Sequence, residues 1–68
     1  NGLGSLIYRN GTRYEGEFKE GRWNGNGTFT FPDGEKWVGE FRKDAPWNIN
    51  WYNKSGKIIA KWGDGVKQ

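Results

Sequence analysis

Few side chains in this sequence could carry out chemistry. The 68 residues contain no cysteine and no histidine. This excludes disulfides, Cys or His zinc sites, and nucleophiles that depend on a thiol or an imidazole base. Glu15 and Glu17 share one face of an alternating segment, and Glu40 stands in a similar segment. Paired carboxylates can act as general acid and base, but cations share their face, so we expect ordinary cross-strand charge pairs and no enzyme activity.

Basic side chains offer a second kind of chemistry, which is contact with an anionic partner. The net charge is +3, and residues 1–53 contain as many basic as acidic side chains, so the whole excess lies in residues 54–68. Lys54, Lys57 and Lys61 are the candidates for contact with anionic lipid. Each would contribute about 1 kcal/mol near an anionic surface. The alternative is a solvated sheet edge whose lysines prevent edge-to-edge pairing.

Glycine and aromatic residues set the class of fold. The chain has 12 glycines, five tryptophans, three tyrosines and four phenylalanines. Disordered chains are poor in aromatic residues, and glycine-rich sequence with Trp, Tyr, Phe and Thr is typical of β structure rather than of a helical bundle. The composition therefore predicts an all-β fold built around rings.

The chain repeats itself at an offset of 23 residues. The segment Tyr14-x-Gly16-x-Phe18 corresponds to Trp37-x-Gly39-x-Phe41, and Asn10-Gly11 corresponds to Asp33-Gly34. A third copy is degenerate, as terminal copies in repeat arrays usually are. We expect a single repeat domain over residues 1–68. Its parts are repeat 1 at about 2–24, repeat 2 at about 25–47 and a capping repeat at about 48–68.

Each repeat is predicted to form one β-hairpin. Asn-Gly and Asp-Gly pairs are the strongest signals of a type I′ turn, because both central residues need positive φ. The expected turns lie at about 8–12, 31–36 and 53–57. Three hairpins then give six strands in one twisted antiparallel sheet.

Alternation along the predicted strands places most rings on one face. This predicted aromatic face consists of Tyr14, Phe18, Phe29, Phe31, Trp37 and Phe41. Glycines alternate with these rings, so a ring from one strand can lie over a glycine of its neighbour. The glycines expected to have this or a turn role are Gly11, Gly16, Gly25, Gly27, Gly34 and Gly39.

These residues resemble the MORN (membrane occupation and recognition nexus) repeat. The resemblance rests on Tyr14 to Gly21, on Gly25-x-Gly27, and on Phe31 with the Asp33-Gly34 turn, and it covers roughly residues 2–44. It implies a curved single-layer sheet of stacked hairpins and non-enzymatic roles in protein assembly or near membranes. The tail, residues 45–68, also resembles a variant repeat of antitoxin-like bacterial proteins.

Three binding roles follow from these features. The first is a non-catalytic module for protein–protein interaction, scaffolding or self-association through the aromatic face, which also serves as the core of the sheet. The second is a peripheral-membrane module that uses the lysines, and the third is an antitoxin-like inhibitor of a partner protein. We expect no cofactor, metal or small-molecule substrate, and a cytoplasmic or membrane-peripheral location. Nucleic acid is disfavoured because no RNP or OB signature is present.

Overall fold

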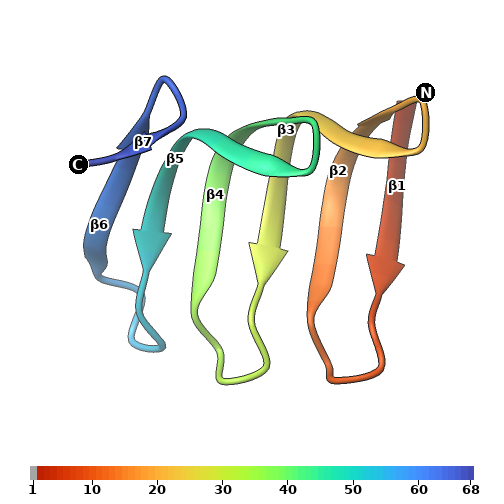
Figure 1. Cartoon of the computed structure of the whole chain (residues 1–68). Coiled ribbons are helices and arrows are strands. Elements are labelled where there is room, and N and C mark those ends of the chain that lie inside the picture. The colour runs from red at the N-terminus through yellow and green to blue at the C-terminus, as the bar shows by residue number, and fades with distance from the viewer. Residues whose placement is uncertain (1) are drawn as a thin grey trace.

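The computed structural model describes residues 2–68, which form one antiparallel sheet with its strands in chain order (Figure 1). The predicted all-β, single-layer fold is confirmed. The described residues contain no helix, and so none that is long and apolar enough to cross a membrane. The seven strands are β1 (Gly2–Ile7), β2 (Arg13–Lys19), β3 (Arg22–Thr30), β4 (Lys36–Arg42), β5 (Ala45–Tyr52), β6 (Ile58–Gly63) and β7 (Val66–Lys67). Six strands were expected, and β7 is the addition.

The turns predicted from Asn-Gly and Asp-Gly lie where expected, but the predicted turn type is wrong. Gly11 N donates to Tyr8 O at 3.1 Å, and in this turn only Gly11 has a positive φ. This is a three-residue loop closed by a left-handed glycine, not a type I′ turn. The Asn10 side chain explains the difference, because its Oδ1 accepts a hydrogen bond from Thr12 N at 2.9 Å and holds the loop. Asp33 makes the equivalent bond to Glu35 N at 2.9 Å.

Turns of the type I′ kind occur at the opposite end of the sheet. Two residues with positive φ join β2 to β3 (Glu20-Gly21), β4 to β5 (Lys43-Asp44) and β6 to β7 (Asp64-Gly65). We call the end of the sheet that carries these three turns the bend end. Lys43-Asp44 contains no glycine, so no sequence signal marked it as a tight turn.

A row of glycines crosses the first four strands. Gly4 pairs with Gly16, Gly16 with Gly27, and Gly27 with Gly39. A Cβ on Gly16 would meet the backbone of Gly27 and Asn26, and one on Gly39 would meet that of Asn48. Register shifts follow at once, between Gly16 and Phe18 and between Glu40 and Phe41. The strands can therefore approach closely and bend along this row, and Figure 1 shows β3 and β5 crossing the bend end before they turn down the sheet.

The bend encloses a core on one face of a single layer. The Tyr14 ring lies over Gly27, and the Trp23 ring stacks on Tyr14 at 5.1 Å between centroids and 12° between planes. Tyr14 Oη donates to Glu17 O at 2.8 Å, and the Phe41 ring meets Tyr14 edge-on at 5.3 Å. Tyr14 and Phe41 are both 0% exposed. The two rings are therefore as buried as the core of a two-layer protein.

Gly27→Ala should destabilise the protein by about 1–3 kcal/mol, the usual cost of overpacking a core. The new methyl group would meet the Tyr14 hydroxyl and stand 2.7 Å from its Cζ. Gly4→Ala is the matched control, because its methyl group would meet only the Phe18 ring, at 3.2 Å. We expect the control to change the free energy of unfolding by less than about 1 kcal/mol. Urea denaturation measures both, and equal losses would contradict the assigned role of Gly27.

Candidate functional site

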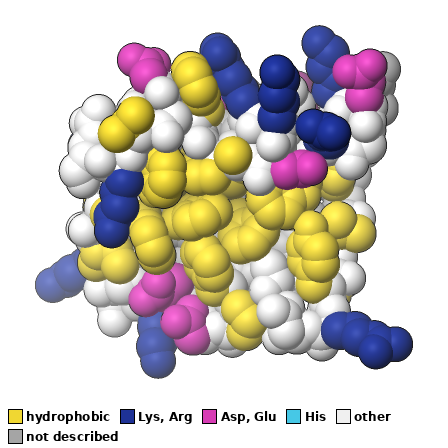
Figure 2. Space-filling view, in the orientation of Figure 1, with side chains coloured by type: hydrophobic (Ala, Val, Ile, Leu, Met, Phe, Trp, Pro, Cys, Tyr) yellow, Lys and Arg dark blue, Asp and Glu magenta, His cyan; other side chains and the backbone are white. Residues whose placement is uncertain are grey.

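The aromatic face of the folded protein is a continuous patch of rings (Figure 2). Six half-buried rings surround the buried Tyr14, Phe29, Phe41 and Ile49; these are Phe18, Trp23, Phe31, Trp37, Trp51 and Trp62. Successive rings touch edge-on, as in the pairs Phe31–Trp37 at 4.9 Å and Trp37–Trp51 at 5.5 Å. No second layer covers this face within the described part of the chain. Large apolar groups therefore remain in contact with solvent.

The structure places all six predicted rings on this face, with different exposure. Tyr14, Phe41 and Phe29 are 0%, 0% and 9% exposed, so they form the buried core against which the accessible rings pack. Phe18 and Phe31 are half-buried and present ring surface, as does Trp37.

Sequence reasoning missed three rings of the face. Trp51 and Trp62 fall within the predicted capping repeat at about 48–68, and Trp23 has no predicted role. The available signal for Trp23 was its alternation with Gly25 and Gly27, which share its side of β3. The structure joins all three to the patch, which extends the face over β3, β5 and β6.

Polar groups are sparse on the aromatic face. Trp51 Nε1 donates to Glu35 Oε1 at 2.9 Å, and Lys67 Nζ lies 5.3 Å from the Trp51 ring centroid. The indole N–H groups of Trp37 and Trp62 are buried and have no acceptor among residues 2–68. The polar contacts that this face offers are therefore concentrated around Trp51.

Asp44 fixes the position of Trp23 over the face. Asp44 Oδ1 accepts from Trp23 N at 2.8 Å, and Asp44 N donates to Trp23 O at 3.2 Å. Asp44 has a φ of 63°, and the corresponding turn residue before β7 is Gly65, whose N donates to Trp47 O at 2.9 Å. An aspartate is tolerated in this conformation and adds a side-chain acceptor that glycine lacks.

The candidate acid–base carboxylates have structural partners. Glu15 Oε1 lies 3.2 Å from Arg13 Nε in the same strand. Glu17 Oε1 accepts from Asn26 N at 2.6 Å, and Glu40 Oε1 accepts from Asn48 Nδ2 at 3.3 Å. The cross-strand partners of Glu17 and Glu40 are thus asparagines and not the expected cations. Among the described residues, no group of three or more carboxylates could hold a metal ion.

The C-terminal lysines do not form one patch. Lys54 and Lys57 lie in the turn between β5 and β6, whereas Lys61 lies within β6. Lys67 is on the aromatic face, over Trp51. All four are exposed.

A different group of cations gathers at the bend end. Lys19, Arg22 and Lys43 line one hollow of about 340 Å³. Glu20 also lines this hollow, so the cations there are partly balanced. The charge count by sequence segment did not reveal the group, because the fold brings Lys43 of the β4–β5 turn beside Lys19 and Arg22, which flank the β2–β3 turn.

A single-layer sheet of consecutive hairpins, with glycines in register and rings on one face, defines a hairpin-repeat β protein. Comparison with known families matches the MORN repeat at residues 1–13 and 14–36, which is more than half of the chain. The chain belongs to the MORN repeat family. MORN repeats are non-catalytic modules that are generally involved in protein or membrane interaction. The second match begins at Tyr14 and includes the Gly16 and Gly27 of the glycine row.

Asp44→Ala should lower stability by about 2 kcal/mol, since it removes a hydrogen bond and places alanine in a left-handed conformation. Asp44→Asn keeps an acceptor and the tolerance for positive φ, so we expect it to cost less than about 1 kcal/mol. Urea denaturation followed by tryptophan fluorescence measures both. If the asparagine variant were as unstable as the alanine variant, Asp44 would not act through this bond.

Tyr14→Phe should have an effect that depends on pH. Burial raises the pKa of the Tyr14 phenol above its ordinary 10.0, and the Glu17 and Asp44 carboxylates raise it further. The folded state therefore keeps the phenol neutral at a pH where the unfolded chain ionises it, so its contribution to stability is complete below pH 10 and falls above it. The variant should be less stable by about 1 kcal/mol at pH 7, and the difference should shrink as the pH rises through and beyond 10. A constant difference between pH 7 and pH 11 would contradict this account.

Proposed function

We propose that this chain is a non-catalytic protein-interaction module that binds an apolar segment of a partner protein on its aromatic face. The observation that carries the proposal is the continuous patch of half-buried rings on a sheet that has no second layer. Leu6 and Tyr8 extend the patch to the first strand and are 41% and 40% exposed. A contiguous exposed apolar surface of this kind is typical of interaction sites.

The composition of the face supports protein as its ligand. Tryptophan and tyrosine are enriched among the residues that contribute most to protein interfaces, because they bury large areas and lose little conformational entropy. The rings of the face already hold one another in edge-on and stacked contacts, so binding would require little ordering. Charged residues lie around the rings, as Figure 2 shows, which matches the apolar centre and polar rim of known interfaces.

Membrane contact is the second candidate function, and the bend end is the feature that favours it. Lys19, Arg22 and Lys43 share a hollow there, with Glu20 as its one acidic lining residue, whereas Lys54, Lys57 and Lys61 are dispersed over a turn and a strand. Contact of these cations with anionic headgroups would weaken as salt is added, because exposed charges are screened. Binding through the aromatic face would withstand moderate salt.

Selection of peptides from a random library against the wild-type chain would test the aromatic face. Peptides that bind should lose at least about tenfold in affinity for Trp51→Leu, since Trp51 is a central accessible ring. Ile7→Gln is the control, because Ile7 is 68% exposed and pairs with Arg13 on the opposite face. Urea denaturation of both variants establishes that they are folded under the binding conditions. Peptides whose affinity depends on Ile7 and not on Trp51 would overturn the proposal.

A further inference from the structure

The face opposite the rings, which we call the back face, contains two adjoining hollows. One has a volume of about 410 Å³ and is lined by Val38, Asn50 and Lys61, among others. The other has about 250 Å³ and is lined by Val38, Lys36, Lys54 and Tyr52, among others. The two hollows meet at Val38, which is 37% exposed. Together they form a shallow groove across β4, β5 and β6.

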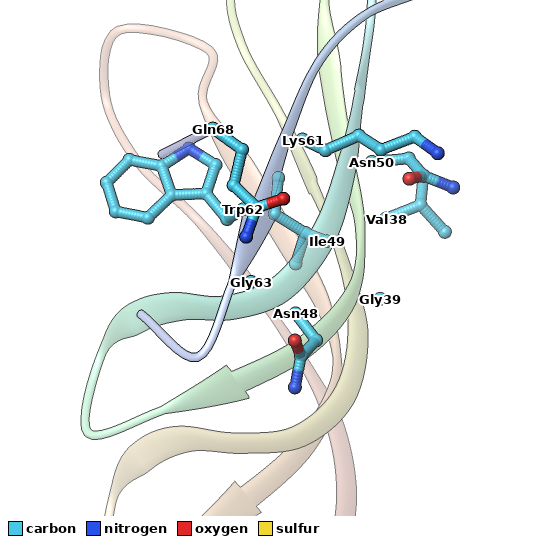
Figure 3. A pocket seen from close by; sticks show the side chains of 9 residues that line it. All are labelled: Val38, Gly39, Asn48, Ile49, Asn50, Lys61, Trp62, Gly63 and Gln68. Atoms are coloured by element: carbon cyan, nitrogen blue, oxygen red, sulfur yellow. The ribbon is translucent and has the colours of Figure 1, made fainter. Parts of the chain in front are cut away.

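Strand register brings the groove residues together. Val38 pairs with Asn50, which pairs with Lys61, and Lys36 pairs with Tyr52 in the adjacent row. Figure 3 shows the side chains of Val38, Asn50 and Lys61 on the same side, away from the Trp62 indole. The groove therefore has apolar surface at Val38 and Tyr52, with Lys36 in the row of Tyr52 and Lys61 at the far end of the row of Val38.

We propose that this groove binds an extended acidic segment of a partner protein. Lys36 and Lys54 would contact one carboxylate, Lys61 would contact a second, and an apolar side chain between them would lie between Tyr52 and Val38. The Asn50 amide, beside Lys61, can donate to the segment's backbone carbonyls and accept from its N–H groups. This is a second binding surface that is independent of the aromatic face.

The sheet geometry sets the spacing of the two carboxylates. Lys36 and Lys61 are two strands and one side-chain row apart, which corresponds to roughly 12 Å between their backbone positions. In an extended peptide, residues four apart are separated by about 13 Å and point to the same side. The preferred sequence is therefore acidic, any residue, apolar, any residue, acidic.

The charges elsewhere on the back face favour a narrow ligand over a membrane. Glu15, Glu17 and Glu40 pair with Ser5, Leu3 and Asn48, which places them in rows of this same face. An anionic bilayer lying flat on the back face would approach these carboxylates as well as the lysines. A single extended segment over β4 to β6 meets the lysines without covering Glu15 and Glu17 in β2. Glu40 stands in the row next to Val38, where its Oε1 accepts a hydrogen bond from Asn48 Nδ2.

Titration of the labelled protein with a short peptide, followed by NMR, tests the proposal. The probe has the core glutamate-threonine-valine-threonine-glutamate with blocked, uncharged ends, and the control peptide has glutamine at both glutamate positions. We expect the glutamate peptide to shift the amide resonances of Val38, Asn50 and Lys61, and the glutamine peptide to bind much more weakly. Lys36→Gln and Lys61→Gln should each weaken binding roughly twofold to fivefold, the range for exposed ion pairs.

Lys19→Gln is the matched control, since it removes the same charge at the bend end. Equal weakening by Lys19→Gln would show a general charge effect and overturn the proposal, as would equal binding of the glutamine peptide or an absence of shifts with the glutamate peptide. Sedimentation with phosphatidylserine vesicles that depends on Lys36 and Lys61, but not on Lys19, would assign the groove to lipid instead. None of these outcomes involves Trp51, so failure here leaves the test of the aromatic face unaffected.

Discussion

Close approach of backbone to backbone along the glycine row is the constraint on which this structure depends. Where Gly16 meets Gly27 and Gly39 meets Asn48, there is no space for a Cβ. The bulges that follow let the chain turn a corner, and this corner carries Trp23 back over Tyr14. A single layer of sheet can therefore bury a ring completely, with glycine below it and tryptophan above. Sheets without such a bend need a second layer to cover one face.

The same bend determines which rings are available for binding. Tyr14 and Phe41 lie inside the corner and are inaccessible to solvent, whereas Trp37, Trp51 and Trp62 lie beside it on β4, β5 and β6 and remain half-exposed. Core and candidate binding surface are thus two parts of one set of rings. Among residues 2–68, the back face has no continuous patch of rings: beside Val38 and Tyr52 its groove carries lysines and an amide, which suits it to a ligand of different chemistry.

Period-two alternation and the 23-residue repeat were sufficient to predict the sheet, the side of each predicted ring and the positions of three turns. They could not place Trp23 over Tyr14, because that contact arises from a bulge and a corner that strand periodicity does not encode. The turn type at Asn10-Gly11 was wrong because the Asn10 side chain binds Thr12 N and stabilises a longer loop. The grouping of cations at the bend end could not be predicted, because Lys19 and Lys43 are brought together only by the packing of two hairpins side by side.

The contact between the Tyr14 ring and Gly27 is the most direct test of this account. It is measured as the nuclear Overhauser effect between the Tyr14 ring protons and the Gly27 Hα protons in the free protein. The account predicts a strong effect, together with Gly27 Hα shifts far from those of an unstructured chain. Absence of the effect, with unperturbed Gly27 shifts in a protein that otherwise shows the β1 to β6 pairing, would contradict it.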